Sequence, residues 1–179
     1  MRNKIFIFLA YRNSTHQFIE LVKHLNKKYK VSCLVFGYEN YNKVKKNKIF
    51  FEEIFSYEKL VDSFYKNLKL VENKELIRIE KEIGSLWNVI YADRQLLDTY
   101  YDQNYGKKKF NYKELISFVY QWYNFFDQIF KNKNFKYLIN YATASLPAYL
   151  STKIGKKYET KYLLIKTLAI PDRLSILDD

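Results

Sequence analysis

Apolar and polar positions follow one another along the first forty residues in a pattern that predicts alternating strands and helices. Lys4–Leu9 is apolar on both faces, which is typical of a central strand in a parallel sheet. After a polar loop, apolar residues recur at helical spacing from Phe18 to Leu25. Val31–Phe36 forms a second apolar run, which Gly37 closes. The succession of strand, helix and strand predicts a βαβ unit with a right-handed crossover.

Helical periodicity dominates the middle of the chain. We expect Asn40–Asn47 to be a charged connection and Ile49–Ile54 to be a short third strand. Three helical segments follow, at about Glu58–Val71, Leu76–Ile90 and Leu115–Ile129. The pattern Asn111-x-x-Glu114 precedes the third segment and is typical of a helix cap. These segments predict a helical insertion at about residues 58–131.

The pattern returns to strand, helix and strand near the end of the chain. Tyr137–Asn140 predicts a strand, and Ser145 with Pro147 predicts the start of a helix. Gly155 is expected to end that helix in the left-handed conformation, and Tyr162–Ile165 is expected to be the last strand. The sequence therefore predicts an α/β fold, a Rossmann-like parallel sheet flanked by helices and carrying the helical insertion.

Length and composition fit this fold class. The 179 residues, of which 48% are hydrophobic, suit a single domain over residues 1–179. The longest apolar run, Ile5–Tyr11, is far below the roughly 20 residues that a bilayer span requires. We therefore expect a cytoplasmic protein, with peripheral contact to the inner face of the cell membrane left open. Cys33 is the only cysteine, so no disulfide within the chain is expected, and its small apolar side chain suits a strand interior.

The formal net charge of +12 raises the question of anionic partners. Nucleic-acid recognition favours arginine, yet only five arginines occur among the 31 basic residues, at Arg2, Arg12, Arg78, Arg94 and Arg173. The scarcity of arginine among the basic residues thus argues against a specific nucleic-acid partner. It fits a general attraction to anions, either phosphorylated substrates or an anionic membrane surface.

Two predicted loops are candidate binding sites because ligands collect beyond the carboxyl ends of parallel strands. Each precedes a helix N-terminus, where free amide groups and the helix dipole favour anions. The substrate-binding candidates on these loops are Arg12, Asn13, Ser14, Thr143 and Ser145. His16 is a candidate general base because imidazole titrates near neutral pH. The competing interpretation is ordinary helix capping beside a solvated histidine.

Other kinds of site lack their signatures. No G-x-G-x-x-G fingerprint or Walker loop follows a predicted strand. The sequence contains only four glycines, too few to form a glycine-rich loop around a pyrophosphate. This disfavours a small nucleotide-dependent enzyme of flavodoxin-like shape. No Cys/His cluster and no G-x-S-x-G elbow occurs. We expect no metal and no bound cofactor.

The segment from Glu80 to Arg94 departs most clearly from a generic helix. Gly84 destabilises a helix interior by about 1 kcal/mol relative to alanine, so it predicts a break or a close approach. Trp87 is expected to lie in the core. The Asp93-Arg94 pair fits a solvated helix end and a functional site equally well.

At this segment the sequence resembles capsular and surface-polysaccharide biosynthesis proteins with the two-Rossmann-domain (GT-B type) glycosyltransferase architecture. The resemblance rests on an acidic residue, a glycine, a Leu-Trp step and an acidic-Arg pair, at Glu80, Gly84, Leu86, Trp87, Asp93 and Arg94. The opening strand and loop, Leu146-Pro147-Ala148 and the turn from Pro171 to Arg173 are compatible with it. The resemblance covers most of the chain.

The resemblance implies the acceptor-side N-terminal domain of a glycosyltransferase, with an acceptor glycan or lipid-linked sugar as partner. His16 or Asp93 would then be the catalytic base, and Arg12 or Arg94 would contact an acceptor phosphate. A nucleotide-sugar donor would be held by a second domain or a partner chain, because the sequence ends where that domain would begin. The alternative is a non-enzymatic basic module that binds nucleic acid or an anionic membrane surface.

Overall fold

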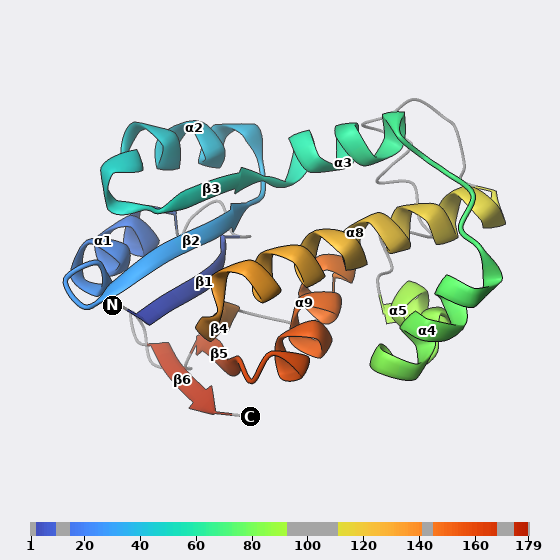
Figure 1. The fold of residues 1–179 in the computed structure, drawn as a ribbon. Helices are drawn as coiled ribbons and strands as arrows, with labels where there is room; N and C mark the ends of the chain where they lie inside the picture. The colour runs from blue at the N-terminus through green and yellow to red at the C-terminus, as the bar shows by residue number, and fades with distance from the viewer. Residues whose placement is uncertain (1–2, 10–14, 93–110, 141–144, 168–173, 179) are drawn as a thin grey trace. The chain divides into compact units, whose positions relative to one another are not determined.

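A computed structural model describes residues 3–9, 15–92, 111–140, 145–167 and 174–178 (Figure 1). The chain divides into two compact units. The sheet unit consists of Met1–Ser63, Lys133–Tyr141 and Glu159–Asp179. The helical unit consists of Phe64–Asn132 and Ala142–Tyr158.

The sheet unit is built on one six-stranded sheet in the order β3-β2-β1-β4-β5-β6. The strands are β1 (Asn3–Leu9), β2 (Tyr29–Val35), β3 (Glu53–Ser56), β4 (Phe135–Asn140), β5 (Lys161–Thr167) and β6 (Leu174–Asp178). The first five are mutually parallel, and β6 pairs antiparallel with β5. Parallel strands with helices between them confirm the predicted α/β, Rossmann-like class.

Two strand predictions need correction. Tyr162–Ile165 is not the last strand, because β6 follows and places Leu177 opposite Leu164. A five-residue edge strand gives little periodicity to read. The third strand also begins later than expected: Lys48–Phe50 forms a short 3-10 helix, η2, and β3 starts only at Glu53.

Helices α1 (Thr15–Leu25) and α2 (Tyr38–Lys46) belong to the sheet unit. The expectation that Asn40–Asn47 is a connection was wrong, since most of that segment lies in α2. This helix buries only Asn40 and Val44, one turn apart. A single buried apolar residue is too sparse a pattern to predict a helix from periodicity.

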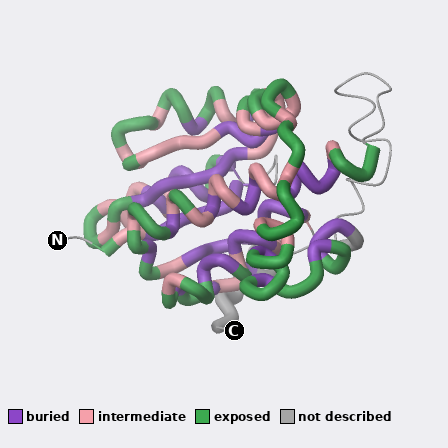
Figure 2. The backbone as a smooth tube through the Cα atoms, turned by 45° about the vertical axis from the view of Figure 1, so that its right-hand side comes forward, coloured by how far each residue is buried: buried purple, intermediate pink, exposed green. Residues whose placement is uncertain are grey.

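One face of the sheet packs against α1 and α2 in a largely aliphatic core. The buried side chains come from β1, β2, both helices, β4 and β5, and include Ile5, Ile7, Leu9, Phe18, Val22, Val31, Cys33, Val35, Val44 and Ile139. The opposite face of β1 is also buried, at Phe6 and Phe8. The last five residues of β1 and of β2 are all buried, and Figure 2 draws buried residues in purple. The prediction that β1 is apolar on both faces is confirmed.

The helical unit contains α4 (Asn73–Ile83), α5 (Leu86–Ala92), most of α8 (Tyr112–Lys133) and α9 (Leu146–Lys157). Helix α3 (Tyr57–Lys66) begins in the sheet unit and ends in the helical unit. Helices α3, α4, α5 and α8 occupy the described part of the segment predicted as a helical insertion.

The capping prediction at the start of α8 is confirmed. The amide of Glu114 donates to Asn111 Oδ1, and the amide of Asn111 donates to a Glu114 carboxylate oxygen, both at 3.0 Å. The prediction for Gly155 was wrong, because this residue is buried inside α9, which continues to Lys157. The left-handed conformation occurs instead at Glu159, where φ is 56°.

Candidate functional site at the strand-ending edge of the sheet

The topology of the sheet places its switch point between β1 and β4. From β1 the chain continues to β2 on one side, and from β4 it continues to β5 on the other. The two strands are adjacent and parallel, with Ile7 opposite Ile139. They end at Leu9 and Asn140 on the same edge, which we call the strand-ending edge. Ligands of doubly wound sheets bind beyond such a point.

A buried polar contact fixes the first turn of α1 at this edge. Thr15 Oγ1 donates to Asn40 Oδ1 at 2.9 Å, and Asn40 Nδ2 donates to the carbonyl of Phe36 at 2.8 Å. Thr15 and Asn40 are only 3% and 2% exposed. One amide side chain therefore joins the start of α1, the end of β2 and the first turn of α2. This contact anchors Thr15, the first residue of α1.

A carboxylate organises the neighbouring strand ends in a similar way. The amide of Gly37 donates to Glu58 Oε1 at 2.5 Å, and Ser56 Oγ donates to Glu58 Oε2 at 3.2 Å. Gly37 has a φ of 89°, a backbone conformation that residues with a Cβ rarely adopt, so glycine suits this turn. The rings of Phe36 and Tyr57 stack at 4.4 Å between centroids. The ends of β2 and β3 are thus held together by the carboxylate and the aromatic pair.

Of the predicted site residues, the structure describes only two. His16 is exposed on the first turn of α1, directly after the buried Thr15. Ser145 is half-buried at the N-cap of α9 with an extended backbone, and its side chain forms no capping hydrogen bond. The remaining six lie outside the described residues: Arg12, Asn13, Ser14, Asp93, Arg94 and Thr143.

Sequence reasoning missed three residues that shape this edge: Asn40, Ser56 and Glu58. Ser56 directly follows the apolar Ile54-Phe55 step and Glu58 stands two residues further on. Polar residues after an apolar strand are the signal that could have found them. Asn40 gave no such signal because its segment resembles a charged loop.

In the helical unit, Glu80 and Gly84 have a clear structural role in the motif that carried the resemblance. Gly84 ends α4 with a φ of 87°, which confirms the predicted break. Glu80 Oε1 accepts a hydrogen bond from the amide of Leu86 at 2.9 Å. Glu80 therefore satisfies an amide at the start of α5 and fixes the turn between the two helices.

The expectation that Trp87 lies in the core was wrong. Its side chain is 43% exposed and stacks on Tyr112 with ring centroids 5.4 Å apart. The buried positions of α5 are Leu86, Val89 and Ile90, which follow helical spacing. Trp87 lies outside that stripe.

A charged network joins α4, α8 and α9 within the helical unit. Lys157 Nζ donates to Glu82 Oε2 at 2.8 Å and to Asp127 Oδ1 at 3.0 Å. The hydroxyl of Tyr123 also donates to Glu82, and that of Tyr158 donates to Asp127 at 2.7 Å.

The pKa values of this network follow from its contacts. Partial burial opposes ionisation of Glu82 and Asp127, but the hydrogen bonds from Lys157 and the two tyrosines hold both carboxyl pKa values below their usual range. Burial, together with the Glu82 contact, raises the pKa of Tyr123 to about 12. Tyr123 therefore stays protonated near neutral pH and donates to Glu82, so the network connects α4, α8 and α9 through hydrogen bonds.

Three further observations concern the described residues. Among them no group of three His, Cys, Asp or Glu side chains is arranged to hold a metal ion. Cys33 is fully buried in β2, as expected, and burial raises the pKa of its thiol. No described helix combines the length and the apolarity that crossing a bilayer requires.

No known family model matches the sequence, and no curated protein is significantly similar to it. The class of protein is therefore defined by the fold: an α/β protein with a Rossmann-like sheet and a structured strand-ending edge at the switch point.

Proposed function

We propose that this chain is the acceptor-side domain of a glycosyltransferase of capsule or surface-polysaccharide biosynthesis. The observation that carries the proposal is the adjacency of β1 and β4 at the switch point. β1 and β4 both end at the strand-ending edge, and each precedes a loop predicted from the sequence, Tyr11–His16 after β1 and Tyr141–Ser145 after β4. The resemblance at Glu80, Gly84, Leu86 and Trp87 supplies the chemical class of the reaction.

The buried Thr15–Asn40 contact supports the proposal because a binding loop needs a rigid base. In this proposal Arg12, Asn13 and Ser14 bind the acceptor, and Arg12 neutralises an acceptor phosphate. His16 would remove the proton from the attacking hydroxyl, a role that suits an exposed imidazole on the first turn of α1. Asp93 is the alternative base, and Arg94, Thr143 and Ser145 are further acceptor contacts. The nucleotide-sugar donor would be bound by a second domain or a partner chain.

A transfer assay tests this function. The chain is combined with the product of the next gene downstream, nucleotide sugars and surface glycan fragments, and transferred sugar is measured. If His16 is the base, His16→Gln lowers the rate by about a hundredfold or more, the usual contribution of general base catalysis. His24→Gln is the matched control, since His24 is the other exposed histidine of α1.

Two results would contradict the proposal. One is the absence of both glycan binding and sugar transfer, with the chain alone and with its neighbour. The other is transfer that responds equally to the two histidine substitutions, which would contradict the role of His16 as the base.

A further inference from the structure

The opposite edge of the sheet unit, where the strands begin, is strongly basic. The ends of α1 and α2 and the starts of β1 and β2 bring together the lysines of this basic edge: Lys4, Lys27, Lys28, Lys30, Lys45, Lys46 and Lys48. Two observations bring these elements together: Lys23 of α1 lies 5.6 Å from the ring of Phe50 in η2, and Glu52 lies within 4 Å of both Lys4 and Lys30. In Figure 1, β1, β2 and β3 all begin at the left, where α2 ends.

The carboxylates described at the basic edge do not neutralise it. Glu52 is shared between Lys4 and Lys30, at 3.9 and 3.8 Å. Glu53 pairs with Lys133 at 2.7 Å. Within the described part of the chain, no carboxylate forms an ion pair with the three lysines around η2, which are Lys45, Lys46 and Lys48. These three side chains are exposed and project positive charge into solvent.

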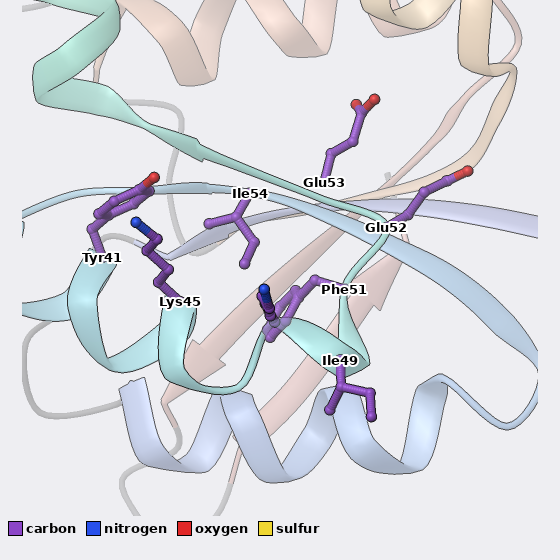
Figure 3. Close-up of a pocket in the computed structure, with 8 residues that line it drawn as sticks. Tyr41, Lys45, Ile49, Phe51, Glu52, Glu53 and Ile54 are labelled. Carbon is purple, nitrogen blue, oxygen red and sulfur yellow. The ribbon is translucent and has the colours of Figure 1, made fainter.

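An apolar feature lies among these lysines. Ile49, at the middle of η2, is 81% exposed. Beside it is an open hollow of about 620 Å³, lined by Tyr41, Lys45, Lys48, Ile49, Phe51, Glu52, Glu53 and Ile54 (Figure 3). In Figure 3 the side chains of Glu52 and Glu53 point away from Phe51 and Ile54. Apolar side chains therefore line the centre of the hollow, and two lysines without a described ion pair, Lys45 and Lys48, share its rim with Glu52 and Glu53.

We propose that the basic edge docks on an anionic lipid bilayer, with Ile49 entering the interface and the lysines contacting the headgroups. Lysines near a membrane surface are attracted by anionic lipids. An exposed apolar side chain within the basic patch strengthens binding further, because it is removed from water when it enters the bilayer interface. A nucleic-acid partner fits less well, because this edge contains no described arginine for bidentate phosphate contacts and Ile49 would gain little from a phosphodiester backbone. This inference is independent of the proposed glycosyl transfer.

Co-sedimentation of the full chain with lipid vesicles tests the proposal. Vesicles of phosphatidylcholine alone are compared with vesicles that also contain phosphatidylglycerol, at low and high salt. We expect binding to the anionic vesicles only, and weaker binding as salt screens the lysines.

Two variants locate the contact. Lys45→Gln/Lys46→Gln/Lys48→Gln should weaken vesicle binding by about fivefold for each lysine. Ile49→Ser should weaken it by about tenfold, because the side chain loses its burial in the interface. All of these positions are exposed, so circular dichroism spectra should match those of the parent chain.

The matched controls lie in the helical unit. Lys81→Gln/Lys113→Gln/Lys131→Gln removes the same number of exposed positive charges, and Leu70→Ser replaces another exposed apolar residue, 77% accessible. Equal losses in the variants and their controls would overturn the proposal, as would equal binding to neutral vesicles. Loss of binding to random RNA in the first triple variant, without binding to any vesicle, would assign the basic edge to nucleic acid instead.

Discussion

The sheet unit and the helical unit stabilise their interiors by different means. In the sheet unit, main-chain hydrogen bonds connect strand to strand, and aliphatic side chains fill the space beneath α1 and α2. In the helical unit the main-chain bonds of α4, α5, α8 and α9 lie within each helix. In the described residues, contacts that involve side chains therefore connect these helices to one another. We expect single side chains to matter more in the helical unit than in the sheet unit.

The polar contacts of the two units also differ, in whether the groups carry charge and in how far they are buried. Buried hydrogen bonds between uncharged groups, from Thr15 to Asn40 and from Asn40 to Phe36, join elements of the sheet unit. Partly exposed ion pairs centred on Lys157 join the helices. Stability of the helical unit should therefore depend on pH, whereas the Asn40 contact should not.

The largest expected effect is that of Trp122→Ala in α8. Trp122 is fully buried, and its ring packs on Phe64, Phe118, Phe125 and Phe126. Removing it leaves a cavity among aromatic side chains, so the free energy of unfolding should fall by about 3 to 5 kcal/mol. Urea unfolding followed by circular dichroism measures the change.

The second tryptophan gives a matched control. Trp87 is 43% exposed and stacks on Tyr112, so Trp87→Ala should cost far less than Trp122→Ala. Similar losses in the two variants would mean that the aromatic cluster around Trp122 is not the main support of the helical unit.

An intermediate effect is expected for Asn40→Leu in the sheet unit. This substitution removes both hydrogen bonds of the amide and leaves Thr15 and the Phe36 carbonyl without this partner, at a cost of about 1 to 3 kcal/mol. Asn42→Leu, on the exposed side of α2, is the control and should be nearly neutral. The loss in Asn40→Leu should be the same at pH 7 and at pH about 4, because the network has no charge to titrate.

The smallest effect concerns pH and the Lys157 network. The pKa values of Glu82 and Asp127 are lowered in the folded chain, so their contribution is present above the unfolded values, which are near 4.5 and 3.8. It is lost as the pH falls below about 5, and for such partly exposed pairs it amounts to about 1 kcal/mol or less. Lys157→Gln should reduce this part of the acid sensitivity, because only the tyrosine hydroxyls and Arg78 would remain beside the carboxylates, whereas Lys156→Gln should leave it unchanged. An unchanged acid profile in Lys157→Gln would show that other carboxylates cause the sensitivity.

Much of the fold was predictable because long apolar runs record burial directly. The runs at Lys4–Leu9 and Val31–Phe36 coincide closely with β1 and β2, and the Asn111–Glu114 pattern forms the expected capping box. Elements that bury few apolar residues were missed. Helix α2 buries one aliphatic side chain, and β6 is a short strand paired on one described side only.

The candidate site was predictable only in its position. The rule for parallel sheets selects the loops after β1 and β4, and the structure places these strands side by side. The supporting residues Asn40 and Glu58 come from neighbouring connections, and their role depends on contacts across 21 to 25 positions of sequence. Such long-range contacts leave no local pattern. The wrong expectation for Trp87 has the same origin, because hydrophobicity alone does not reveal which face of a helix is covered.

If the basic edge docks on a membrane as proposed, the seven-residue length of β1 has a geometric consequence. At about 3.3 Å per residue, the strand separates its two ends by about 20 Å. If the basic edge rests on the headgroups, the strand-ending edge stands off from the bilayer by about that height. An acceptor sugar attached directly to a lipid headgroup would not reach it, whereas the growing end of a glycan several sugars long would. Acceptors of graded length should therefore show a threshold below which no transfer occurs.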